Sequence, residues 1–248
     1  MKTALSSSNP FASSPSQVTW AYGYEFIPEG SIVLDYGCAS GDFITIAAEH
    51  KKMTAYGVEK NKDLVLSLNR PIIRHVDREI PFPDASFDVV TLFDVIEHVY
   101  DQKFLLREIR RVLKPGRMIV VTAPHQYAFS FLDPGNMKYR FRWLHKLWYT
   151  RRHSAAEYDY KYVNNPYGLI GDVDKEKAWH QHFKKAELRH LIESAGFRMT
   201  DMDGFGRYND LMVLLGAFGI KFSEKFWAWQ QYKFDNVMLL STAKVSPN

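Results

Sequence analysis

The sequence predicts an α/β fold, built on a mostly parallel sheet with helices on both faces. Short apolar runs alternate with helical patterns from residue 31 to residue 123, the order expected when each strand is followed by a crossover helix. Hydrophobic residues make up 46% of the 248-residue chain and charged residues 24%, which is ordinary for a folded domain with a sizeable core.

Each element follows from its own pattern. The apolar run 31–36 ends in Asp and Gly, as a buried parallel strand often does before a turn. Similar runs predict strands at 53–58, 72–76, 87–93 and 118–123. Helical patterns lie between them at 43–50, 60–68 and 103–113, and Lys114-Pro115-Gly116 ends the last of these helices. A helix at 184–195, with Gly196 at its C′ position, precedes strands at 197–202 and 234–243.

Three segments lack this regular pattern. Residues 1–16 are rich in Ser, Pro and Asn, which predicts a disordered or loosely attached tail before a single domain over 17–248. Long aromatic insertions at 125–182 and 204–231 interrupt that domain. No apolar run reaches the roughly 18 residues of a spanning helix, and the first residues do not resemble a signal peptide. One cysteine, Cys38, excludes a disulfide framework and a Cys-rich zinc site, so we expect a cytoplasmic protein.

The loop after the first strand, Val33–Phe43, has the composition of a ligand-binding turn. Gly37 permits a sharp turn and Gly41 a close approach of the backbone to a ligand. Their spacing matches neither the dinucleotide pattern G-x-G-x-x-G nor a P-loop. Asp35 and Asp42 would repel a phosphate but tolerate a cationic ligand. The loop therefore favours a ligand without a pyrophosphate.

Two further carboxylates follow neighbouring strands. Glu59 ends the second strand, where a carboxylate can accept hydrogen bonds from both hydroxyls of a ribose. Asp77 follows the third strand, where it can accept from an adenine amino group. The alternatives are a solvated charge at the strand end for Glu59 and a turn-forming role for Asp77.

Longer stretches resemble a known family. HVDREIPFPDASFDVV, FDVIEHVYDQKFLLREIRRVLKPGRMIVVTAP and HFKKAELRHLIESAGF are similar to the class I S-adenosylmethionine (SAM) dependent methyltransferases. The resemblance implies a Rossmann-like, seven-stranded sheet with an antiparallel last strand, and SAM as the methyl donor. It implies that the first loop holds the methionine portion, Glu59 the ribose and Asp77 the adenine. The implied donor-binding residues are Asp35, Gly37, Cys38, Gly41, Glu59, Asp77, Phe93 and Asp94. We also expect the Cys38 side chain to pack as a small buried hydrophobic group.

The catalytic residue is less defined, because methyl transfer needs a base only when the acceptor carries a proton of high pKa. The candidate bases are His125, His182 and His98, with His180 as a further one. Each could instead serve packing or bound the acceptor pocket. A separate hypothesis places a divalent cation on Asp94, Glu97, His98 and His182.

The first insertion is basic and aromatic. Residues 138–162 carry seven basic side chains against two acidic ones, and Trp143, Leu144, Leu147 and Trp148 fall at helical spacing. This pattern fits an amphipathic lid on the inner membrane surface, a basic mouth for a phosphate-bearing acceptor, or a packed helix with a solvated basic face.

These observations favour a SAM-dependent O-methyltransferase acting on a small molecule or a saccharide (glycan) acceptor. No separate RNA-binding module is visible, so a nucleic-acid acceptor is not expected. The alternative is a catalytically inactive SAM-binding or methyltransferase-like scaffold that docks a partner or membrane through its basic aromatic insertion. An NAD-dependent oxidoreductase is disfavoured because the dinucleotide glycines are missing.

Overall fold

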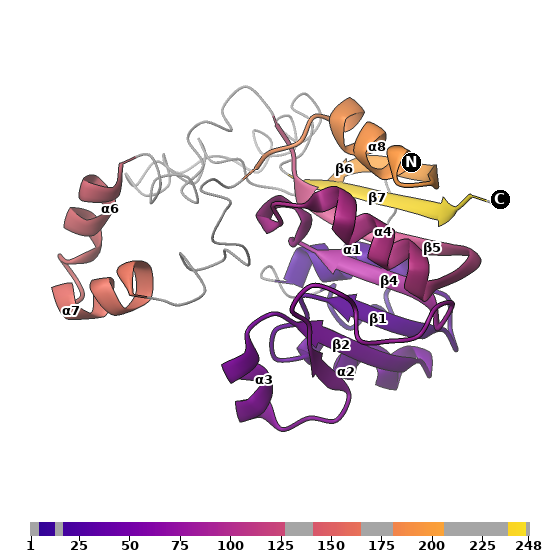
Figure 1. The fold of residues 1–248 in the computed structure, drawn as a ribbon, viewed down its shortest axis with the longest axis horizontal. Coiled ribbons are helices and arrows are strands. Elements are labelled where there is room, and N and C mark those ends of the chain that lie inside the picture. Colours follow the sequence, from indigo (N-terminus) through magenta and orange to yellow (C-terminus); the bar gives the residue numbers. More distant parts are fainter. Residues whose placement is uncertain (1–4, 13–16, 127–140, 165–180, 206–237, 247–248) are drawn as a thin grey trace.

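The computed structural model describes residues 5–12, 17–126, 141–164, 181–205 and 238–246. Their strands form one seven-stranded sheet in the order β3-β2-β1-β4-β5-β7-β6 (Figure 1). The strands are β1 (Ile32–Tyr36), β2 (Thr54–Glu59), β3 (Ile73–His75), β4 (Phe87–Phe93), β5 (Leu113–Pro124), β6 (Phe197–Phe205) and β7 (Met238–Val245). The first five run parallel, whereas β7 is antiparallel to both β5 and β6. The predicted fold class is therefore confirmed, including the antiparallel last strand.

Helices cover both faces of this sheet. They are α1 (Val18–Glu25), α2 (Asp42–Lys51), α3 (Lys62–Leu68), α4 (Gln102–Val112) and α8 (Lys185–Ser194). One hydrophobic cluster joins buried residues of α1 and α2 to the sheet, and a second joins those of α4 and α8. Neighbouring strand residues go to opposite clusters, as Val33 and Leu34 of β1 do, because side chains alternate along a strand.

The N-terminal residues correct one prediction. Phe11 is fully buried and stacks on Phe43, with 5.4 Å between the ring centroids. The Asn9 side-chain amide donates to the carbonyl of Ala21 in α1 over 2.7 Å. Residues 5–12 therefore pack on the domain, and the expected loose tail is wrong for them. The polar composition of residues 1–16 does not indicate this packing, because the packing depends mainly on one buried aromatic side chain, Phe11.

The helix α1 was also not predicted. Its sequence VTWAYGYE has no apolar stripe at helical spacing, so only packing on the sheet reveals it. Two strands are longer than predicted because pairing with neighbouring strands extends them. β5 begins at Leu113, which pairs with Phe87, and β6 continues to Phe205 beside β7. Residues 234–237 of the last predicted strand lie outside the described residues.

The first insertion contains described helices. These are α6 (Arg142–Tyr149), α7 (Ala155–Tyr158) and a π-helical turn at Asp159–Val163. They lie to one side of the sheet, away from the helices that cover it (Figure 1). The second insertion, 204–231, lies almost wholly outside the described residues. In the part of the chain that the structure describes, no helix is long and apolar enough to cross a membrane.

Candidate functional site

The glycine loop after β1 is a tight turn at the carboxyl edge of the sheet. The backbone amides of Gly37 and Cys38 both donate to the carbonyl of Val58, over 2.8 and 3.1 Å. Gly37 and Gly41 have φ angles of 78° and 80°, in the left-handed region. A Cβ on Gly41 would lie 2.7 Å from Cδ1 of Ile73, so a larger residue would displace the Ile73 side chain in addition to straining the backbone.

Arg70 binds the glycine loop through its guanidinium group. No pattern in the sequence around Arg70 indicates this contact. Its Nη1 donates to the carbonyl of Ser40 over 2.8 Å, and its Nη2 donates to Oγ1 of Thr45 over 2.6 Å. One guanidinium therefore joins the loop to the first turn of α2. The partners are 30 and 25 residues away, so only the fold brings them together.

Glu59 joins the end of β2 to the same loop. Its Oε2 accepts from the backbone amide of Ala39 over 3.0 Å, and its Oε1 accepts from the amide of Asn61 over 2.9 Å. Each carboxylate oxygen has two lone pairs, so both can accept a further hydrogen bond from a ligand hydroxyl. Glu59 is thus a positioned acceptor at the loop rather than a solvated charge.

Asp35 lies buried beneath the loop, in the middle of the sheet. Its Oδ1 accepts a 2.6 Å hydrogen bond from Oγ1 of Thr91, a partner on β4 that the sequence did not suggest. Burial raises the pKa of Asp35 to about 7, and the charge of Glu59 adds to the rise, whereas the Thr91 hydrogen bond opposes it. A cationic ligand near Asp35 would favour its ionised form.

Cys38 has the packing role that we expected. It is buried, and a Cβ on Gly57 would lie 2.4 Å from its Sγ. Burial raises the pKa of the Cys38 thiol, and the charges of Asp35 and Glu59 raise it further. The thiol therefore stays protonated near neutral pH and is a poor nucleophile.

The three remaining predicted donor residues differ in what they present. Asp77 is exposed just after β3. The Phe93 ring is buried edge-on against Phe43, with 4.7 Å between centroids, and fills space left by Gly23. Its role in lining the donor stays a prediction. Asp94 has a φ of 57°, and its Oδ1 accepts from Oγ1 of Thr122 over 2.8 Å.

Two candidate bases meet beyond the end of β5. The amide of Phe183 donates to the carbonyl of Pro124, which brings the chain before α8 alongside β5. His182 Nδ1 then lies 3.2 Å from the carbonyl oxygen of His125, whose own side chain is buried. A carbonyl oxygen only accepts, so this contact puts the proton on Nδ1 and makes Nε2 the basic nitrogen of the neutral ring.

The other histidines are placed differently. His98 ends a 3₁₀ turn after β4, and its Nε2 lies 3.9 Å from Oε1 of the buried Glu97. His180 lies outside the described residues. Among the residues with described positions, Asp94, Glu97, His98 and His182 included, no three His, Cys, Asp or Glu side chains are placed to hold a metal ion.

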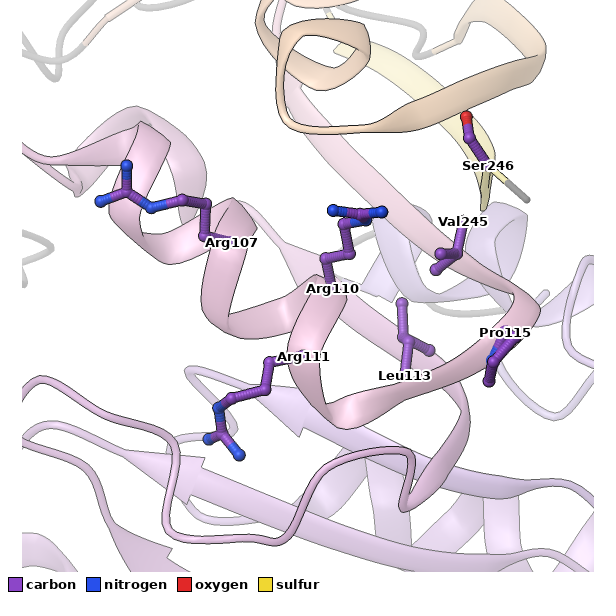
Figure 2. Close-up of a pocket in the computed structure, with 7 residues that line it drawn as sticks. All are labelled: Arg107, Arg110, Arg111, Leu113, Pro115, Val245 and Ser246. Carbon is purple, nitrogen blue, oxygen red and sulfur yellow. The ribbon is translucent and has the colours of Figure 1, made fainter. Parts of the chain in front are cut away.

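A pocket of about 420 Å³ lies at the opposite edge of the sheet, where α4 ends and β5 begins (Figure 2). It is lined by Arg107, Arg110, Arg111, Leu113, Pro115, Val245 and Ser246. The three arginine side chains point in different directions (Figure 2). They do not converge on one ligand position, so the carboxyl edge remains the candidate site.

Comparison with known proteins identifies the class. The model of the methyltransferase-domain family matches residues 18–201, and the chain belongs to this family. A Mycolicibacterium smegmatis protein, named a probable S-adenosylmethionine-dependent methyltransferase, is 37% identical over 106 residues, which are 41% of each chain. The ubiquinone/menaquinone biosynthesis C-methyltransferase of Vibrio campbellii is 27% identical over 187 residues, 69% of this chain and 66% of that protein.

Solved structures agree on the fold. The S-adenosylmethionine-dependent methyltransferase of Mesorhizobium loti superposes with a TM-score of 0.54 at 17% identity, over 91% of this chain and 96% of that one. The chain spans less than two thirds of the length of the two sequence relatives. The family match and the superposition show the family and the fold.

Proposed function

We propose that this chain transfers a methyl group from SAM to an oxygen atom of a small-molecule or saccharide acceptor. The observation that supports it most directly is the tight glycine loop tied to Glu59 and lying above the buried Asp35. Carboxylates at this edge suit a donor that carries an ammonium and a sulfonium. The close approach that Gly37 and Gly41 permit suits a ligand held by backbone groups.

Different residues at this edge of the sheet would bind different parts of the donor. The loop backbone would hold the methionine portion, Glu59 the ribose hydroxyls and Asp77 the adenine amino group. Bound SAM supplies an electrophilic methyl group on a positively charged sulfur, which departs as a neutral thioether. The chain therefore needs no acid for the leaving group, and its main task is to align the acceptor with the methyl group.

His182 is the base that we assign to the acceptor side. Its contact with the His125 carbonyl fixes the ring and leaves Nε2 able to take the acceptor's hydroxyl proton. The products are then the methyl ether and S-adenosylhomocysteine, with one proton released. The backbone carbonyl of His125 positions His182, and the ring of His125 is buried.

The test uses SAM with a ¹³C-labelled methyl group and fractions containing phenolics, nucleotide sugars, lipids or RNA. The proposal expects a labelled methoxy carbon, identified by NMR, in a phenolic or saccharide product. The most informative contrary result is a methyl group bound to carbon, because one relative is named as a C-methyltransferase. A C-methyl product would overturn the choice of oxygen, and failure to bind SAM in calorimetry would overturn the function altogether.

His182→Gln provides the matched catalytic test. We expect its kcat for a hydroxyl acceptor to fall 10²-fold or more, as for the loss of a general base, while its SAM affinity stays unchanged. His190→Gln, an exposed change on α8, is the control. Equal kcat values for His182→Gln and the wild type would remove His182 from the mechanism.

A further inference from the structure

The helices α6 and α7 and the π-helical turn after them form a small unit with its own aromatic core. Tyr158 is almost fully buried and packs against Tyr149 and Tyr162, with 5.6 and 4.9 Å between ring centroids. Lys146 on α6 pairs with Asp159 over 2.7 Å. One face of α6 is therefore fixed to this unit.

The opposite face of α6 is apolar and exposed. Trp143 and Trp148 have 71% and 61% of their surface exposed, and Leu144 and Leu147 have 37% and 50%. Spacings of one, four and five residues place all four side chains on one side of a helix. Neighbouring large apolar groups are rarely left in water without a function, especially two tryptophans.

Among the described residues, two cations directly follow α6. Arg151 and Arg152 follow the helix and are exposed. Two acidic residues of the unit form contacts within it. Glu157 accepts a hydrogen bond from the Tyr149 hydroxyl over 2.9 Å, and Asp159 is paired with Lys146. Two exposed cations therefore lie at the end of the helix that carries the apolar stripe, and Glu157 and Asp159 form contacts within the unit.

We propose that the outer face of α6 docks on an anionic lipid surface. Tryptophan rings favour the boundary between headgroups and acyl chains, and arginines beside them would meet lipid phosphates. A helix of eight residues is about 12 Å long, too short to supply alone the roughly 800 Å² per partner of a stable protein interface. A shallow interfacial insertion needs no larger area.

Vesicle sedimentation tests the proposal. The full chain should bind vesicles of phosphatidylcholine with phosphatidylglycerol at low salt and bind pure phosphatidylcholine at least tenfold more weakly. Trp143→Ser combined with Trp148→Ser should reduce binding tenfold or more without lowering the melting temperature. Arg151→Glu combined with Arg152→Glu should abolish the preference for phosphatidylglycerol. Leu66→Ser is the control, because Leu66 is 67% exposed and lies on α3.

Several results would overturn the proposal. These are absence of binding to the anionic vesicles, or equal binding by the wild type and the double tryptophan variant. A dimer in analytical ultracentrifugation that the tryptophan variant loses would assign the face to a second copy of the chain instead. SAM binding in calorimetry stays the same in all these variants if the two sites are independent, so failure here does not depend on the methyl-transfer proposal.

Discussion

At the residue scale, Glu59 connects the loop, the strand end and the proposed ribose. Replacing it with Gln keeps its shape but substitutes an amide donor for one acceptor oxygen. We expect SAM affinity to fall about 10-fold or more, equivalent to about 1.4 kcal/mol, since a charged acceptor is lost at a hydroxyl site. Isothermal titration calorimetry measures this. Glu49→Gln, an exposed change on α2, should bind SAM as the wild type does.

If Glu59→Gln binds SAM with wild-type affinity, the ribose assignment is wrong. A drop in melting temperature of the same variant would instead indicate that the hydrogen bonds to Ala39 and Asn61 chiefly maintain the fold.

Asp35 gives a prediction with a defined pH range. Its ordinary pKa of 3.8 rises to about 7 on folding, mainly through burial, so folding favours the protonated form. Its contribution to stability is therefore fully present below pH 3.8 and is lost as the pH rises through 7. Asp35→Asn cannot ionise and should lose less stability across this range. Urea unfolding of both proteins at several pH values measures the difference, and parallel curves would contradict it.

At the element scale, Arg70 acts as a clamp between the glycine loop and α2. Arg70→Ala removes hydrogen bonds to Ser40 and Thr45 and should cost about 1–3 kcal/mol of stability. Because the loop is freed, the KM for SAM should rise at least several-fold while the KM for the acceptor stays the same. Arg74→Ala on β3 is the control, since Arg74 instead donates to the carbonyl of Pro81. Equal changes in both KM values would indicate a general loss of structure.

A second arginine stabilises the far end of the sheet. Arg111 on α4 donates to the carbonyls of Ile80 and Phe82 and pairs with Glu108 over 2.8 Å. Arg111→Ala should lower the free energy of unfolding by about 2–4 kcal/mol, because it leaves the partly buried Glu108 without its cation. Chemical denaturation measures this loss. SAM affinity measured below the melting temperature should not change, because Arg111 lies at the opposite edge from the loop.

At the scale of the whole molecule, the proposed donor site lies where several elements already pack on one another. The loop, β2 and α2 meet there, so a bound donor should stabilise the entire domain. SAM at 100 times its dissociation constant should add about 2.7 kcal/mol and raise the melting temperature. S-adenosylhomocysteine should act similarly, and NAD should not, because the loop lacks the glycines for a pyrophosphate. An equal shift with NAD in thermal denaturation would contradict the donor assignment.

The sequence alone was sufficient for the strands of the sheet and for α2, α3, α4 and α8, but not for α1. It also indicated the tight turn at the glycine loop. Strand and helix patterns depend on neighbours a few residues apart, and the demands on Gly37 and Gly41 arise within one turn. The family resemblance rests on the same contiguous stretches and is confirmed by the methyltransferase-domain match over residues 18–201. The individual donor contacts of Glu59 and Asp77 stay predictions.

The tertiary structure decided what depends on distant partners. Arg70 reaches the loop, Thr91 reaches Asp35 and His182 reaches the His125 carbonyl only after the strands pair. Phe11 becomes a core residue because α1 and α2 enclose it, and Trp143 stays exposed because the other side of α6 is occupied. A sequence pattern shows that a side chain is apolar or charged, but burial depends on which surfaces meet, and that is settled by the packing of the whole chain.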